Sequence, residues 1–209
     1  MLSQDPHTYN SRNKKSIKDF IDELFSKHAK LLPVRIDLSY KMNQTIAKEF
    51  NHTGDLDYLH NSNLAPHAYL TREDIIFNWN KLLDKLRWNT RAFLAELVGY
   101  AWKIEYGNEK GMHYHIMLFF NGNRAQKDFY YADTLGQLWL EITQGQGLYF
   151  NCSIDKVYRY GNHNGLKVTH RNDDRTNIYQ TAKYLAKIDV NEDKARNYSY
   201  GRLFGKSGA

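Results

Sequence analysis

Two histidines set two residues apart in a short apolar run are the side chains in this sequence best suited to chemistry. His113 and His115 lie within residues 111–120, a run too short for a helix and rich in aromatic and aliphatic side chains. In an extended strand, side chains two residues apart point to the same face of the sheet. The pattern therefore predicts a strand that carries two imidazoles side by side, which is half of a metal site.

Glu105 adds a carboxylate if the preceding segment pairs with this strand. Residues 99–106 alternate in the manner of a strand, and residues 107–111 are turn formers. Directly opposed residues of an antiparallel hairpin share a face, and a loop centred on Glu109 sets Glu105 opposite His113. Two imidazoles and one carboxylate leave coordination positions open for water or substrate, as a catalytic metal centre requires. A His pair alone is more often an ordinary surface or hydrogen-bonded feature.

A tyrosine and a lysine near the C-terminus offer a nucleophile and a cation. Tyr184 and Lys187 are three residues apart in a segment expected to be helical, from Asp174 to about Ile188, so they occupy neighbouring positions on one helix face. A phenol has a pKa of about 10 and is a poor nucleophile. A nearby ammonium favours the phenolate and a negatively charged phosphoryl-transfer transition state.

Tyr179 and Lys183 form a second pair of the same kind. The two tyrosines are separated by about 140° around a helix, so both cannot easily face one metal ion. We select Tyr184 with Lys187 as the catalytic pair and keep Tyr179 with Lys183 in reserve. The chain has 16 tyrosines, and either phenol could instead be an ordinary packing residue.

Helices and further strands are expected to position these residues. Ser16 and Thr71 are each suited to cap a helix, because each precedes a run with apolar residues at helical spacing. The two strands expected after residue 147 can pair with each other across a glycine-containing turn. The expected helices are 16–32, 71–86, 132–142 and 174–188, and the expected strands besides the hairpin are 34–40, 148–158 and 166–170.

The composition indicates one domain with an anionic partner. A chain of 209 residues with 42% hydrophobic residues is long enough for one well-cored domain, which we expect at 16–209 after a flexible tail at 1–15. The formal charge of +6 is concentrated beyond residue 154, where 11 Lys/Arg face 6 Asp/Glu, and it suits nucleic acid. The candidate DNA-binding residues in this part, each of which could also be a solvated charge, are Arg159, Lys167, Arg171 and Arg175.

Cysteine content and hydropathy indicate the compartment. Cys152 is the only cysteine, so an intrachain disulfide and a thiolate zinc site are both excluded. The polar N-terminus lacks the apolar core of a signal peptide, and no apolar run approaches the roughly 20 residues of a membrane span. We expect a cytoplasmic protein with no membrane partner, in a bacterium or, for a phage-encoded protein, in the host cytoplasm.

The ordered set of motifs resembles the HUH endonucleases, the superfamily of rolling-circle replication initiators, relaxases and single-strand transposases. A strand containing Glu105 is followed by His-Tyr-His at 113–115 and by Tyr-Leu-Ala-Lys at 184–187. The resemblance covers roughly Leu32 to the C-terminus. The segments most similar to the inovirus-type initiators of filamentous phages and related prophage elements are 102–107, 111–122 and 202–207.

The resemblance implies an α+β fold, with an antiparallel sheet of about five strands, a central histidine strand and flanking helices. It also implies that His113, His115 and Glu105 bind Mg²⁺ or Mn²⁺, of which Mn²⁺ suits imidazole ligands better. Tyr184 would attack single-stranded DNA at a replication origin and leave a 5′-phosphotyrosine and a free 3′-hydroxyl, while Lys187 steadies the charge. Initiators with two active tyrosines usually space them one helical turn apart, so the five positions from Tyr179 to Tyr184 favour a single catalytic tyrosine.

Other functions stay open at this stage. A DNA-binding regulator or origin binder could keep the fold without chemistry, and a metal-dependent phosphodiesterase could use water in place of tyrosine. No phosphate-binding loop of a helicase occurs in the sequence, so unwinding would need helicase and replication proteins of the host or the replicon.

Overall fold

The computed structural model describes residues 7–41, 70–89, 91–107, 111–154 and 166–208. Expectations for residues 1–6, for the loop around Glu109 and for Arg159 fall outside these ranges. The elements are α1 Ser11–Lys27, β1 Lys30–Tyr40, α4 Arg72–Trp88, η2 Ala92–Leu94, β2 Leu97–Gly107, β3 Gly111–Asn121, α5 Asp128–Ile142, β4 Gly147–Asn151, β5 Thr169–His170, α6 Thr176–Lys183, η3 Tyr184–Ala186, α7 Glu192–Asn197 and β6 Phe204–Lys206.

One six-stranded antiparallel sheet organises the fold. Its strands follow the order β4-β1-β3-β2-β6, and the short strand β5 pairs with β1. The central strand is β3, which carries both histidines. The predicted α+β fold with a central histidine strand is therefore confirmed, with one strand more than the approximate number expected.

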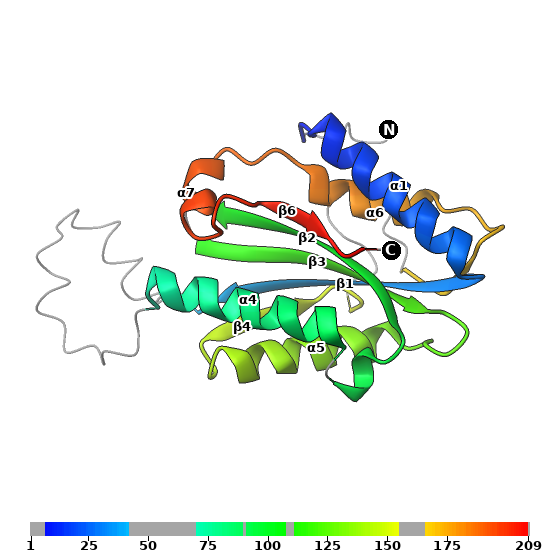
Figure 1. Cartoon of the computed structure of the whole chain (residues 1–209), viewed down its shortest axis with the longest axis horizontal. Helices are drawn as coiled ribbons and strands as arrows, with labels where there is room; N and C mark the ends of the chain where they lie inside the picture. Colours follow the sequence, from blue (N-terminus) through cyan, green and yellow to red (C-terminus); the bar gives the residue numbers. More distant parts are fainter. Residues whose placement is uncertain (1–6, 42–69, 90, 108–110, 155–165, 209) are drawn as a thin grey trace, which may run out of the picture.

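Helices cover both faces of the sheet (Figure 1). On one face, Trp79 of α4 stacks on Tyr114 of β3 with ring centroids 4.4 Å apart. On the other face, α1 and α6 bury Met117 and Phe119 of β3. Because side chains alternate along a strand, His113 and His115 belong to the same face as Met117 and Phe119. The histidines thus lie on the α1 and α6 side of the sheet.

The N-terminal helix begins earlier than expected. The side chain of Asn10, not Ser16, caps α1 by accepting a hydrogen bond from the Asn13 backbone N–H at 3.0 Å. The residues before it also pack, since Tyr9 forms a β-bridge with Lys187. The Asn10 backbone N–H donates to the Ala186 carbonyl at 2.8 Å. The expected flexible tail at 1–15 is therefore wrong for residues 7–15, because residues 8–10 bond to residues 186–188 and residues 11–15 are helical.

One other expectation is confirmed, and another needs correction. The capping box at the start of α4 forms between Thr71 and Asp74. β5 pairs with β1 at Lys30 and Leu31, and the expected pairing of 166–170 with 148–158 across the intervening turn falls on residues outside the described ranges. The last helix ends at Lys183, and the chain continues as a 3₁₀ turn, η3. Within the described ranges, the helices are all too short or too polar to cross a membrane.

Candidate metal centre and tyrosine site

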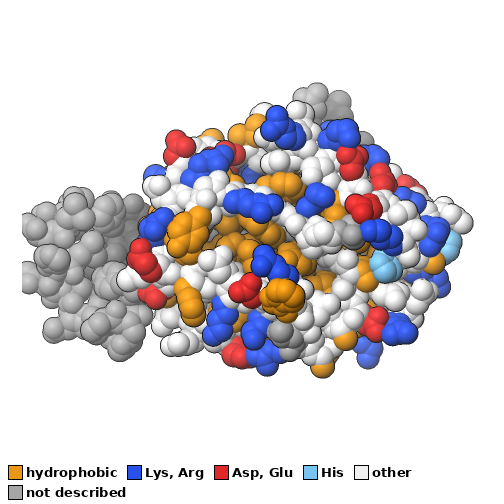
Figure 2. Space-filling view, in the orientation of Figure 1, with side chains coloured by type: hydrophobic (Ala, Val, Ile, Leu, Met, Phe, Trp, Pro, Cys, Tyr) orange, Lys and Arg blue, Asp and Glu red, His pale blue; other side chains and the backbone are white. Residues whose placement is uncertain are grey.

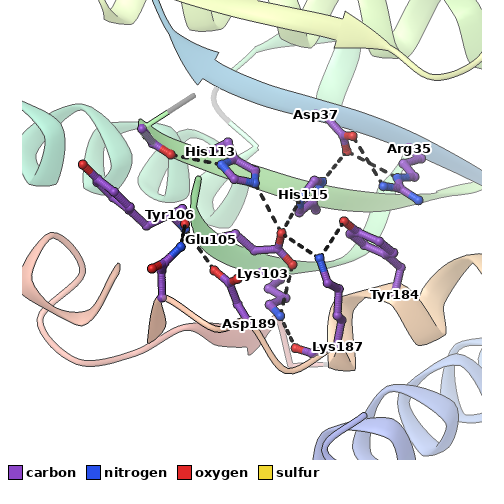
Figure 3. Close-up of polar contacts among 12 residues, drawn as sticks. Arg35, Asp37, Lys103, Glu105, Tyr106, His113, His115, Tyr184, Lys187 and Asp189 are labelled. Carbon is purple, nitrogen blue, oxygen red and sulfur yellow. Dashed lines mark hydrogen bonds and ion pairs between the residues drawn. The ribbon is translucent and has the colours of Figure 1, made fainter. Parts of the chain in front are cut away.

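The register of three neighbouring strands brings polar side chains into two rows (Figure 3). On β2, Glu105 lies opposite His113 and Lys103 opposite His115, so the predicted hairpin register is confirmed. On β1, Asp37 lies opposite His115. Directly opposed residues share a face, and these side chains therefore gather around the two imidazoles.

Glu105, His113 and His115 converge closely enough to hold a metal ion. Their potential ligand atoms all lie within 4.8 Å of one another. The Glu105 Oε2 atom is 3.3 Å from His113 Nε2 and 3.4 Å from His115 Nε2. The convergence predicted from strand parity is confirmed, because all three residues lie on one face of a regular hairpin.

The contacts of the other ring nitrogens leave Nε2 of each histidine available. His113 Nδ1 lies 3.1 Å from the Gly111 carbonyl, which can only accept, so Nδ1 carries the hydrogen. His115 Nδ1 lies 2.8 Å from Asp37 Oδ1. A carboxylate or carbonyl that holds one imidazole nitrogen in this way fixes the ring orientation and presents the other nitrogen to a metal.

The residues therefore fit a divalent cation. Among the described residues, His115 Nε2 and Glu105 Oε1 are buried and make no well-aligned hydrogen bond, although Glu105 Oε2 lies 3.4 Å from the first atom and the Lys103 ammonium 3.1 Å from the second. An unsatisfied buried polar atom is costly, and a cation coordinated by these ligands would remove that cost. Nitrogen and oxygen ligands of this kind are compatible with several first-row divalent metals and with magnesium.

The electrostatics of the cluster favour a positive charge between its carboxylates. Burial raises the pKa of Glu105, but its contacts with the two histidine rings and the charge of Lys103 outweigh burial and hold that pKa below its usual range. Burial likewise raises the pKa of Asp37, while His115 and Arg35 lower it further than burial raises it. Burial lowers the pKa of His115, but Asp37 and Glu105 raise it overall. A proton or a metal cation can supply the charge that these carboxylates attract.

Tyr184 stands beside this cluster at the start of η3. Its ring meets the His115 ring edge to face, with centroids 4.9 Å apart. The Lys187 ammonium lies 3.5 Å from the Tyr184 hydroxyl and 3.6 Å from Glu105 Oε2. The guanidinium of Arg35 lies over the Tyr184 ring, 4.7 Å from its centroid. The phenol is therefore surrounded by cations and by the candidate metal ligands.

Three contacts with β2 hold residues 184–191, which we call the tyrosine turn, against the sheet. The Lys103 ammonium donates a short hydrogen bond to the Lys187 carbonyl and lies 3.1 Å from Glu105 Oε1. The Tyr106 backbone N–H donates to Asp189 at 3.3 Å, and the Asn191 side chain donates to the Tyr106 carbonyl at 3.1 Å. The segment that follows Tyr184 is thereby fixed along the strand that carries Glu105.

The reserve pair lies elsewhere. The Tyr179 hydroxyl donates a short hydrogen bond to Asp22 of α1, and burial raises its pKa. The Lys183 ammonium lies over the Tyr9 ring, 4.6 Å from its centroid. Tyr179 thus lies between α1 and α6 and Lys183 lies against Tyr9, and of the two pairs the structure brings only Tyr184 and Lys187 together with Glu105.

The candidate DNA-binding residues are not gathered at this site. Arg175 pairs with Asp22 at 3.0 Å, and the Arg171 backbone N–H donates to the Ala29 carbonyl just before β1 begins. Lys167 is exposed two residues before β5. The other end of β1, at Lys30, lies roughly 23 Å along the strand from Asp37. On the face drawn in Figure 2, Lys and Arg side chains are scattered among acidic ones and form no continuous patch.

Sequence reasoning missed Arg35, Asp37 and Lys103 as members of the site. A signal was present, because strict alternation on residues 34–40 sets Arg35 and Asp37 on the face opposite the apolar side chains. Charged residues that point inward from strands next to a His-x-His strand are candidates for a metal site.

Comparison with known proteins gives one family. The model of the YagK/YfjJ C-terminal domain matches residues 5–203. Neither the curated proteins nor the solved structures include a significant match to the chain.

Proposed function

This chain belongs to the YagK/YfjJ C-terminal domain family, whose description names no activity, and we propose from the geometry of the site that it is a rolling-circle replication initiator. The proposed reaction is metal-dependent nicking and joining of single-stranded DNA through a 5′-phosphotyrosine. The resemblance of its motifs to inovirus-type HUH initiators supports the same reaction.

One observation carries the proposal. The Lys187 ammonium lies between the Tyr184 hydroxyl and Glu105 Oε2, 3.5 Å from the first and 3.6 Å from the second. A single cation therefore connects a nucleophile to a candidate metal ligand. A DNA phosphate held near this ammonium would face the phenol and the three potential ligands together.

The chemistry requires one bond to form as another breaks. The Tyr184 oxygen forms a bond to phosphorus, and the bond from phosphorus to the 3′-oxygen of the preceding nucleotide breaks. The phenol loses its proton, and the departing 3′-oxygen gains one. Because one phosphodiester replaces another, no energy source is consumed, and attack by the 3′-hydroxyl on the phosphotyrosine reseals the strand.

The residues around Tyr184 have separate tasks in this step. Lys187 favours the phenolate and stabilises negative charge that develops on the phosphate. Arg35 adds a second positive charge over the ring of the nucleophile. Glu105, His113 and His115 would hold Mg²⁺ or Mn²⁺, which when bound acts as a Lewis acid for the scissile phosphate, and two imidazole ligands favour Mn²⁺.

The proposed partners follow from the same reaction. The substrate is single-stranded DNA at a replication origin, and the formal charge of +6 supports a polyanionic ligand. Lys167, Arg171 and Arg175 stay candidate phosphate contacts, although Arg175 is already paired with Asp22. Helicase and other replication proteins of the host or the replicon would open and copy the duplex, and the expected compartment is the cytoplasm.

A covalent-adduct assay tests the proposal. The chain is mixed with Mn²⁺ and a 3′-labelled single strand from the origin of its own replicon, and the products are separated on a denaturing gel. We expect label to migrate with the protein, to disappear with a chelator or in Tyr184→Phe, and to persist in the matched control Tyr179→Phe.

Each other outcome would support a different nucleophile or a different function. Loss of the adduct only in Tyr179→Phe would move the nucleophile to that residue. Cleavage without an adduct would indicate a phosphodiesterase that uses water. DNA binding without cleavage of any origin strand would refute the nickase and leave a non-catalytic DNA-binding regulator or origin binder.

A further inference from the structure

Two exposed apolar side chains lie on the same face of the sheet as the candidate metal ligands. Phe150 and Leu148 of β4 are each 45% exposed. β4 pairs with β1 so that Phe150 lies opposite Asp37 and Leu148 opposite Ser39. Directly opposed residues share a face, so both apolar side chains point to the side that carries His113.

Each of these side chains begins a row that runs across the sheet into the site. One row is Phe150, Asp37, His115 and Lys103, and the next is Leu148, Ser39, His113 and Glu105. Neighbouring strands are about 4.8 Å apart, which sets β4 about 10 Å from β3. The two apolar side chains therefore flank the metal centre on the side away from Lys103.

The opposite face of β4 is packed, which makes the exposure of Phe150 specific to one side. The Tyr149 ring lies against Gly136 of α5, where an added Cβ would come within 2.2 Å of it. The Tyr149 hydroxyl also donates to Asp133 at 2.7 Å. Packing on α5 thus fixes β4 and holds Phe150 outward on the site face.

We propose that Phe150 and Leu148 form a stacking shelf for an unpaired nucleobase of the DNA strand whose phosphate enters the site. This inference rests on the proposed function and names a contact of its substrate. An aromatic ring stacks on any base, and such stacking contributes to single-strand binding when cations hold the backbone nearby. Arg35, 3.3 Å from Asp37, supplies a cation on the strand next to the shelf, and Lys187, 3.6 Å from Glu105, supplies another at the opposite end of the row.

Binding of short single strands to Phe150 variants tests the shelf. Fluorescence anisotropy measures the affinity of the chain for a labelled oligothymidylate and for an abasic strand of equal length, in the presence of a chelator so that no cleavage occurs. Phe150→Ala is expected to weaken binding of the oligothymidylate roughly 5- to 100-fold and to leave binding of the abasic strand within about twofold.

Matched variants separate stacking from folding and charge. Phe150→Tyr keeps a ring and is expected to bind as the unchanged chain does. Phe150→Leu keeps an apolar residue on the strand and is expected to lose the preference for bases even if Phe150→Ala folds poorly. Phe77→Ala removes a ring that is 64% exposed on α4, at the other face of the sheet, and is expected to change neither affinity.

Two results would overturn the shelf. One is equal loss of affinity for the oligothymidylate and the abasic strand, or no loss, in Phe150→Ala and Phe150→Leu. The other is a dimer in sedimentation that Phe150→Ala dissociates, because a second copy would then cover this face. Neither result depends on cleavage, so failure of the shelf and failure of the nickase in the adduct assay are distinguishable.

Discussion

Asp37→Asn is expected to weaken binding of a divalent cation at Glu105, His113 and His115. Asp37 Oδ1 lies 2.8 Å from His115 Nδ1, and the substitution keeps the size of the side chain while removing its charge. Carboxylates that hold a metal-binding histidine in this way contribute about 10- to 100-fold to metal affinity, which corresponds to about 1.4–2.7 kcal/mol.

The same substitution also has a cost in stability that must be measured separately. The Arg35 side chain is only 6% exposed and pairs with Asp37 at 3.3 Å. Removing the charge of Asp37 leaves the buried Arg35 guanidinium with a weaker acceptor, because a neutral amide oxygen accepts a hydrogen bond less strongly than a carboxylate. We therefore expect a loss of about 1–3 kcal/mol in the free energy of unfolding, measured by urea denaturation.

The assay is a titration with Mn²⁺ at one fixed pH, in which electron paramagnetic resonance measures the free ion. Asp22→Asn is the matched control, because Asp22 pairs with Lys18 of α1 and with Arg175, the residue before α6, and not with the candidate ligands. A folded Asp37→Asn variant that binds Mn²⁺ as tightly as the unchanged chain would refute the role assigned to Asp37.

Further substitutions probe the packing around the site. Lys103→Met should lower the free energy of unfolding in urea by about 1–3 kcal/mol, because the Lys187 carbonyl and the Glu105 carboxylate lose their donor. Lys18→Met should cost less than about 1 kcal/mol, because the ion-pair side chain of Lys18 is 58% exposed. Gly136→Ala should cost about 1–3 kcal/mol in the same assay, because its Cβ would lie 2.2 Å from the Tyr149 ring. Burial raises the pKa of Cys152 to about 12, so the folded thiol stays protonated at mildly alkaline pH, where an unfolded thiol ionises. Iodoacetamide should therefore alkylate the native chain at least about tenfold more slowly than the chain in urea.

A different result would contradict each of these three expectations. Equal stability losses for the Lys103 and Lys18 variants would show that the buried ammonium is not a tether of the tyrosine turn. An unchanged urea midpoint for Gly136→Ala would mean that α5 does not press on β4. Equally fast alkylation with and without urea would show that the Cys152 thiol is open to solvent.

Much of the candidate metal cluster could be predicted from the sequence because its geometry is local. His113 and His115 share a face by the two-residue period of a strand, and a short hairpin loop fixes Glu105 opposite His113. The cap of α4 at Thr71 and the apolar stripe of that helix are equally local. Each of these features depends on residues close together in the chain, so the periodicity alone determines it.

The partners of the cluster depend on pairings that no turn dictates. Asp37 reaches His115 only because β1 pairs with β3, and residues 41–110 separate these two strands in the sequence. The register of such a distant pair is set by the burial of apolar side chains on both faces of the sheet. The alternation of residues 34–40 indicated that Arg35 and Asp37 share a face, but it could not identify the strand that lies beside them.

The sequence by itself offered the candidate metal ligands and two candidate tyrosines, and only the tertiary structure decided which tyrosine lies beside those ligands. Helical spacing offered Tyr179 and Tyr184 alike. The helix ends at Lys183, and Lys103 and the bridge from Tyr9 hold the turn that follows against the sheet. These contacts join distant segments of the chain, and their packing sets Tyr184 beside His115 while Tyr179 faces α1.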